Sequence, residues 1–185
     1  MPTATVQVFT GPDKPLRRRD LALPDRLEPG EVLVALDLAT ICGSDLHTLS
    51  GLRQEPTPLV LGHEAVGRVT ASERPGITPG ERVSWSIADS CGQCSPCAAH
   101  FLPEKCDRLF KYGHAALADG SGLNGCYATH LLLRPGTHIA PVADQLADAL
   151  VAPANCALAT AINACALLPV PCERVLVQGA GLLGL

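Results

Sequence analysis

Four cysteines in the middle of the chain constrain its fold more than any other feature of the sequence. Two residues separate Cys91 from Cys94 and Cys94 from Cys97, and Cys106 follows after eight more. Four thiolates within one loop are the ligands of a closed, tetrahedral zinc site, which leaves no coordination position for a substrate. The sequence therefore predicts a structural zinc ion that stabilises this loop.

Two other interpretations of these cysteines stay open. A ferredoxin-like iron–sulfur cluster uses a shorter last spacing and usually a proline after the last cysteine, whereas Cys106 precedes Asp107. Disulfides are typical of secreted proteins, but residues 1–20 contain no apolar stretch of signal-peptide length. An odd total of nine cysteines without an export signal favours metal ligation, and we expect a cytoplasmic protein.

Length, composition and charge limit the classes of protein to consider. The chain has 185 residues, of which 47% are apolar, enough for one sizeable domain or one domain and the beginning of another. Its net charge of −4 gives no electrostatic footprint for nucleic acid or an anionic membrane surface, and no run reaches the length of a membrane span. We therefore expect neither nucleic-acid nor membrane partners.

Short β segments separated by Gly and Pro dominate the first 140 residues. Apolar alternation and turn signals predict strands at 6–9, 31–38, 58–61, 65–70 and 82–85. Closely spaced short strands of this kind are typical of an antiparallel, barrel-like fold rather than of βαβ units.

Helical patterns replace the strands after Pro141. We expect a short helix at 144–151, capped by Asp144 and interrupted by Pro153, and then an Ala-rich, largely buried helix at 154–168. An apolar strand at 175–177 and the glycine-rich turn with Gly179, Gly181 and Gly184 follow.

A second group of candidate metal ligands is spread along the sequence. Cys42 follows the strand at 31–38, and His63 and Glu64 follow the strand at 58–61. A thiolate, an imidazole and carboxylates are ligands that zinc selects, and a catalytic zinc typically takes three protein groups and leaves one position open. Cys156 is a further candidate, because unpaired N–H groups and the dipole at a helix start favour a thiolate.

Each of these residues also has an ordinary explanation when taken alone. Cys42 and Cys156 could be buried thiols, and His63 could be a hydrogen-bonded turn histidine. The remaining histidines in the second half of the chain are expected to be ordinary surface or loop residues: His100, His114, His130 and His138.

Taken together, six motifs resemble the zinc-dependent medium-chain alcohol dehydrogenases, in the order found in that family. They are ICGSDLH (41–47), GHEAVG (62–67), PGERV (79–83), the four-cysteine loop, GCYA (125–128) and GAGLLG (179–184). The resemblance implies a mainly β chain with a GroES-like, partly open β-barrel domain over 1–142 and connecting helices over 143–172. Residues 173–185 would be the first strand and glycine turn of a C-terminally truncated Rossmann α/β domain that binds NAD or NADP.

The resemblance also implies roles for individual residues. It places a catalytic zinc on Cys42, His63 and Cys156, with Glu64 beside the metal and able to exchange with the open position. Asp45 would orient His63, while Ser44 and His47 would carry the substrate proton to solvent. Thr160 would lie near the nicotinamide, and the glycines at 179, 181 and 184 would approach the pyrophosphate.

The implied function is oxidation of a small alcohol or polyol: alcohol on zinc loses its proton more easily, and hydride passes to NAD(P). Residues 105–114 resemble, faintly, a branch associated with phosphonate catabolism, and threonine dehydrogenases are a further possibility. We expect a homo-oligomer at full length and an inactive isolated fragment. The spacing before Cys106 is one residue longer than the family pattern.

Two functions of other classes stay open. A non-catalytic zinc module or pseudo-enzyme would bind metal only in the four-cysteine loop. A quinone or enoyl reductase on the same scaffold would need no metal at Cys42.

Overall fold

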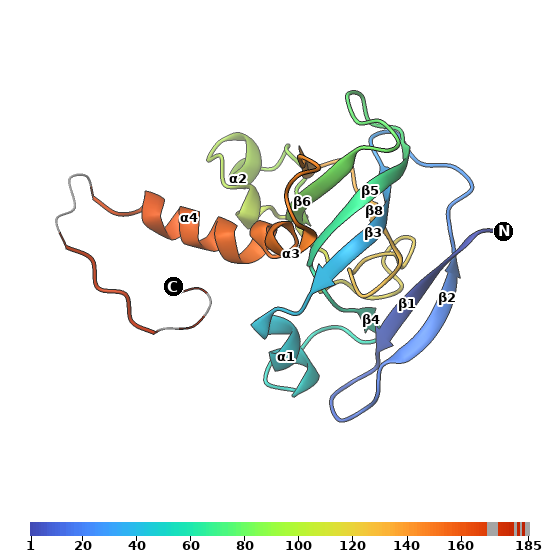
Figure 1. The fold of residues 1–185 in the computed structure, drawn as a ribbon, viewed down its shortest axis with the longest axis horizontal. Helices are drawn as coiled ribbons and strands as arrows, with labels where there is room; N and C mark the ends of the chain where they lie inside the picture. Colours follow the sequence, from blue (N-terminus) through green and yellow to red (C-terminus); the bar gives the residue numbers. More distant parts are fainter. Residues whose placement is uncertain (170–173, 180, 182, 184–185) are drawn as a thin grey trace.

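Two antiparallel sheets form the body of the protein (Figure 1). The computed structural model describes residues 1–169, 174–179, 181 and 183. The smaller sheet has three strands in the order β2 (Arg17–Ala22), β1 (Thr3–Phe9) and β4 (Leu59–Val60). The larger sheet has the order β7 (Phe110–Lys111), β6 (Arg82–Asp89), β5 (Glu64–Ser72), β3 (Val32–Thr40) and β8 (His130–Leu133), and β9 (Thr137–Pro141) also pairs with β6.

The larger sheet curls because its central pairing is irregular. The antiparallel register of β3 and β5 shifts between Leu33 and Val34 and again between Leu36 and Leu38. Such bulges bend a strand and increase its twist. The result is the mainly β, partly open barrel that the sequence predicts, and all five predicted strands are present within a few residues of their expected bounds.

Apolar side chains fill the curled sheet and the space between the two sheets. The main core cluster lies inside the larger sheet and contains Val34, Val69, Trp85, Tyr112 and Leu131, among others. A second cluster joins β1 and β4 to the outer face of the larger sheet through residues such as Val6, Val60, Leu33 and Leu132. Leu33 and Val34 are neighbours on β3 and belong to different clusters, as the alternation of side chains along a strand requires.

Short helices occupy the loops and the end of the chain. They are α1 (Gly43–Leu49), α2 (Ser95–Ala98), the 3₁₀-helix η1 (Pro103–Lys105), α3 (Asp148–Val151), the π-helix η2 (Ala154–Leu158) and α4 (Ala159–Ala166). Figure 1 shows α4 extending away from the sheets.

The first helix predicted after Pro141 begins later than expected. The helix α3 starts at Asp148 with Ala147 as its N-cap, so the prediction that Asp144 caps a helix from 144 is wrong. Asp144 accepts a hydrogen bond of 3.1 Å from Arg68 on β5 instead. Pro153 does interrupt the helical pattern, as predicted: α3 ends at Val151, and Pro153 is the N-cap of η2, where a missing N–H costs least.

The second predicted helix is present, but the prediction that it is largely buried is wrong. Leu158 is 54% exposed and Ile162 is 60% exposed. An Ala-rich, apolar sequence predicts a helix well, because propensity is local, but it does not say whether another element covers that helix.

By length and composition alone, Asp148–Ala166 could cross a membrane, contrary to our expectation that no run is long enough. One such helix is weak evidence for a membrane span, because a helix of a globular protein can pass the same test. Asn155, in the middle of this segment, donates hydrogen bonds of 2.9 Å to the backbone carbonyls of His63 and Trp85.

The strand predicted at 175–177 is not found. Residues 174–179 are described without strand structure, and Leu176 is 94% exposed. A strand of this composition needs paired neighbours on both sides, and the described residues place none beside it. Gly184 and residues 170–173 lie outside the described residues, as do 180, 182 and 185.

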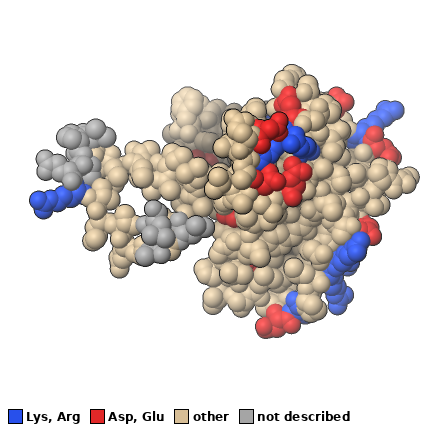
Figure 2. Space-filling model, viewed as in Figure 1, with Lys and Arg blue, Asp and Glu red and all other residues tan. Residues whose placement is uncertain are grey.

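A group of charged side chains ties the segment before η2 to the larger sheet. Figure 2 shows basic side chains bordered by acidic ones on this face, over β5. Arg82, whose side chain is 4% exposed, binds Asp148 and donates to the backbone carbonyl of Ala143 at 2.7 Å. Arg68 binds Asp144 at 3.1 Å and lies 3.9 Å from Asp37. These contacts fix where the chain leaves the barrel and turns into η2.

Replacing Asp148 with Ala is expected to lower the free energy of unfolding by about 1–2 kcal/mol, because buried Arg82 loses a charged partner. The matched change Asp144→Ala removes an exposed pair and is expected to cost less than about 1 kcal/mol. Urea denaturation of both variants, with zinc at a fixed concentration, compares them. Equal losses would contradict the anchoring role of Asp148.

Two candidate metal centres

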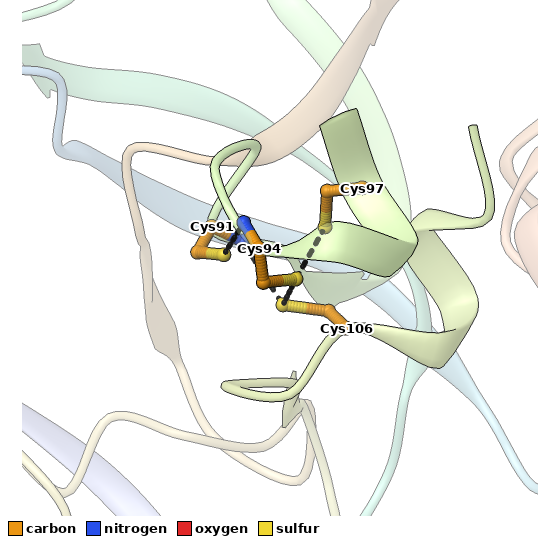
Figure 3. Close-up of side chains that lie close together, drawn as sticks. All are labelled: Cys91, Cys94, Cys97 and Cys106. Atoms are coloured by element: carbon orange, nitrogen blue, oxygen red, sulfur yellow. Dashed lines mark hydrogen bonds between the residues drawn. The ribbon is translucent and has the colours of Figure 1, made fainter. Parts of the chain in front are cut away.

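The four thiols of the cysteine loop lie together (Figure 3). Cys91 follows β6, Cys94 is the N-cap of α2, Cys97 lies within α2, and Cys106 follows η1. Their sulfur atoms all lie within 4.8 Å of one another, with 3.4 Å between Cys94 and Cys97 and 3.8 Å between Cys94 and Cys106. The longer spacing before Cys106 therefore does not separate its thiol from the others.

Backbone N–H groups point at two of these sulfurs. Cys91 Sγ accepts from the N–H groups of Gln93 and Cys94, and these bonds lower the pKa of the Cys91 thiol to about 5. Cys106 Sγ accepts at 3.3 Å from the N–H groups of Cys91 and Arg108.

Cys97, in contrast, resists ionisation without a cation. Desolvation, followed by the neighbouring Cys94 thiol, raises the pKa of Cys97 to about 12. Thiolates crowded this closely repel one another unless a cation compensates their charge. The donor set therefore fits a soft divalent cation such as zinc.

The second candidate centre combines residues from three parts of the fold. Cys42 lies between β3 and α1, His63 and Glu64 lie where β4 leads into β5, and Cys156 belongs to η2. One ligand atom from each lies within 4.8 Å of the others, and the two sulfurs are 3.9 Å apart. Two thiols, an imidazole and a carboxylate also form a donor set that fits zinc.

Asp45 is a fully buried carboxylate that joins the segments of this centre. It accepts from the N–H of Cys42 at 2.9 Å, the N–H of Gly62 at 3.2 Å and the hydroxyl of Tyr127 at 3.1 Å. Its Oδ1 also lies 3.7 Å from Nδ1 of His63, so the structure brings Asp45 beside the imidazole that it is expected to orient. At this distance the contact is electrostatic rather than a hydrogen bond.

The glycine before His63 is required by the backbone and by close packing. Gly62 has a φ of +88°, and a Cβ atom there would lie 2.6 Å from the ring of Tyr127. A side chain at this position would therefore displace both the turn that carries His63 and the ring that contacts Asp45.

Glu64 and Cys156 have local partners that sequence reasoning did not foresee. The hydroxyl of Thr40 donates to Glu64 at 2.7 Å, which leaves the other carboxylate oxygen available to the centre. Cys156 does not have the environment of a helix start, because its N–H already donates to the carbonyl of Pro153 at 3.2 Å. Burial, followed by the charge of Cys42, raises the pKa of Cys156 to about 12, which is the direction opposite to the one expected from a helix dipole.

The other predicted site residues lie in three different places. Ser44 is half-buried and His47 is exposed on α1, and no hydrogen bond joins their side chains to any described residue. Thr160 lines a cleft of about 1100 Å³, together with Cys156 and mostly apolar side chains of β6, β9 and η2. Gly179 and Gly181 are exposed, and apart from their chain neighbours no described atom lies within 4 Å of the place that a Cβ would occupy, while residues 180, 182 and 184 of the predicted turn lie outside the described residues.

Sequence reasoning missed the contacts that three residues make beside the second centre: Tyr127, Asn155 and His114. Tyr127 holds Asp45, and Asn155, one residue before Cys156, links the carbonyl of His63 to that of Trp85. His114 lies in a turn, as expected, but it is not an ordinary surface histidine, because its side chain is 8% exposed and its ring lies 5.1 Å from that of His63. The signals in the sequence were the position of Tyr127 in the GCYA motif and that of Asn155 next to Cys156.

Comparison with known proteins supports one family. The family described as Alcohol dehydrogenase GroES-like domain matches residues 28–144. Among curated proteins, L-threonine 3-dehydrogenase of Streptomyces avermitilis is 36% identical over 169 residues, covering 85% of this chain and 45% of that protein. The protein of the same name from Stenotrophomonas maltophilia is 32% identical over 170 residues, with the same coverage. The chain thus spans about half the length of these relatives.

Solved structures agree with the sequence comparison. The alcohol dehydrogenase of Thermotoga maritima superposes with a TM-score of 0.83 at 30% identity, covering 91% of this chain and 48% of that one. The alcohol dehydrogenase of Thermus sp. ATN1 gives a TM-score of 0.72 at 29% identity, covering 85% and 45% of the two chains.

Replacing Asp45 with Asn is expected to destabilise the protein by about 1–3 kcal/mol, because the amide nitrogen must face an N–H of Cys42 or Gly62 in a buried place. Tyr127→Phe removes a single donor and is expected to cost about 1 kcal/mol or less. Thermal and urea denaturation measure both changes. If Asp45→Asn were no more costly than Tyr127→Phe, the carboxylate would not be the link between these segments.

Proposed function

This chain belongs to the zinc-dependent medium-chain alcohol dehydrogenase family, and we propose that it functions in the oxidation of a small alcohol or polyol with NAD or NADP. The observation that carries the proposal is the second centre, where Cys42, His63, Glu64 and Cys156 gather beside an apolar cleft. A zinc-stabilised module without catalysis would need only the four-cysteine loop. A quinone or enoyl reductase would need no ligand set at Cys42.

Two zinc ions have different roles in this proposal. The four cysteines of the loop would hold a structural ion, since all available positions are taken by thiolates. Cys42, His63 and Cys156 would hold the catalytic ion, with Glu64 beside it. When bound there, zinc supplies Lewis-acid chemistry that lowers the pKa of a coordinated alcohol.

The chain's own residues would prepare the substrate in three ways. Asp45 places its carboxylate near His63 and holds the backbone that carries Cys42. Apolar walls of the cleft would exclude water from the reacting carbon. Ser44 and His47, three residues apart on α1, would pass the proton of the alcohol toward solvent, which the exposed side chain of His47 can reach.

The nicotinamide cofactor has less support from the described residues than zinc has. The family is zinc- and NAD(P)-dependent, and Thr160 shares its cleft with Cys156, as a residue near the nicotinamide would. However, the described residues after 173 do not form a strand, helix or turn that could hold a pyrophosphate.

The relatives direct the choice of substrate. Because proteins named L-threonine 3-dehydrogenase match over 85% of this chain, a β-hydroxy amino acid is the first substrate to test, beside simple alcohols and polyols. We place the protein in the cytoplasm, where nine cysteines would remain reduced and free for metal.

Metal analysis is expected to give two zinc ions per chain, because two complete ligand sets are present. Cys42→Ala should remove one ion, and Cys94→Ala the other. The Cys94 change should cost more thermal stability, because closed zinc sites contribute directly to folding. A single ion in the unchanged protein would favour the non-catalytic module.

In a full-length version of the enzyme, His47→Gln is expected to lower alcohol oxidation with NAD or NADP chiefly at neutral and lower pH, while both zinc ions stay bound, because the imidazole moves a proton and holds no metal. The control is His130→Gln, which changes a histidine on β8 that lies outside the cleft. A pH–rate profile identical to that of the unchanged enzyme would mean that His47 is only a surface residue.

A further inference from the structure

The ring of His63 lacks the hydrogen bond that usually orients a metal-binding histidine. Such a histidine typically donates from its second ring nitrogen to a carboxylate or carbonyl group. In this structure Nδ1 of His63 is buried and has no hydrogen-bond partner among the described residues, and Asp45 lies 3.7 Å away. The contact therefore favours an orientation in which Nδ1 of His63 faces Asp45, but it does not fix the angle of the ring plane.

A second imidazole packs against the ring of His63. The ring centroids of His63 and His114 are 5.1 Å apart, and the planes are tilted by 32°. Both side chains are almost completely buried, at 3% and 8% exposure. Because one ring limits the rotation of the other in so confined a space, the orientation of His114 influences that of His63.

The orientation of His114 is itself fixed by charged groups. Its Nδ1 lies 2.9 Å from Oε1 of Glu55, and since a carboxylate can only accept, Nδ1 carries the proton. Arg53 holds the same oxygen of Glu55 at 2.6 Å. The N–H of Arg53 donates to the carbonyl of His47 at 3.0 Å, which connects the group to α1 and thus to the segment of Cys42 and Asp45.

We propose that His114 and Glu55 are positioning residues for His63, holding its imidazole at the angle at which it can share one cation with Cys42 and Cys156. This inference rests on the proposed catalytic zinc site. His114 is not one of the ligands, because its nitrogen atoms are not among the atoms within 4.8 Å that form the second centre. Its effect is exerted through ring contact alone.

The test measures metal binding rather than turnover. The whole 185-residue chain is loaded with Co²⁺ in place of zinc, and its visible absorption reports the geometry of the thiolate-bound metal. Competition with a chelator gives the affinity of each of the two ions. The variants are His114→Ala, which removes the ring, His114→Phe, which keeps a ring but not the bond to Glu55, and Glu55→Gln, which keeps an acceptor but not the charge.

His114→Ala is expected to lower the affinity of the second centre for its ion by about 10–100-fold, as changes next to a metal ligand typically do. The visible absorption spectrum of Co²⁺ bound there should also shift. His114→Phe and Glu55→Gln should cause smaller losses in the same direction. The ion of the four-cysteine loop should be unaffected in all three, which also shows that each variant has folded. His130→Ala is the control, since that histidine lies on β8, outside both candidate centres and the cleft.

Two results would overturn the inference, and they are distinguishable. If the unchanged chain bound two ions and no variant altered the affinity or the spectrum of the second, His114 and Glu55 would be packing residues only, and the proposed function would stand. If the unchanged chain bound only one ion, in the four-cysteine loop, the proposed function would fail and this inference with it. If His114→Ala did not fold, His114→Phe and Glu55→Gln would decide by the same criterion.

Discussion

The buried carboxylate of Asp45 is the interaction on which the second centre depends. A charge without solvent is costly unless it is hydrogen-bonded, and here three donors from three separate segments satisfy it. Two of the donors are backbone N–H groups, at Cys42 and Gly62, so the carboxylate fixes main chain rather than flexible side chains. Cys42 is itself a candidate ligand, and Gly62 precedes the candidate ligand His63. The hydrogen bonds to Asp45 therefore also bring these two ligands together.

Cys156 reaches the same place by a different route. It follows the last barrel strand in the sequence and lies on the π-helix η2. Helices of this type are rare overall, but they occur often at functional sites. Arg82 anchors the chain before this turn, and Asn155 bonds the turn to the carbonyls of His63 and Trp85. Since both bonds come from the residue next to Cys156, small shifts of the helix relative to the sheet are restrained close to the thiol.

The sequence predicted the parts of the structure that depend on local patterns. Alternation and turn residues located the five strands, and spacing located the four-cysteine loop. It failed where a result depends on a distant partner: Asp144 binds Arg68 instead of capping a helix, and the apolar helix that contains Ile162 is exposed. The candidate ligands were found by likeness to a family. Their supports, such as His114, were not, because a histidine in a loop has the same local sequence whether it is exposed or buried.

Both centres bring ionisable thiols close together, and this affects the pKa values of the thiols. In the four-cysteine loop, N–H groups lower the pKa of Cys91, whereas desolvation and repulsion by neighbouring sulfur raise that of Cys97. At the second centre, burial and the charge of Cys42 raise the pKa of Cys156 in the same way. A divalent cation reverses this repulsion, because it stabilises every thiolate at once. Metal binding at either centre would therefore be coupled to the packing of the loops that carry its ligands.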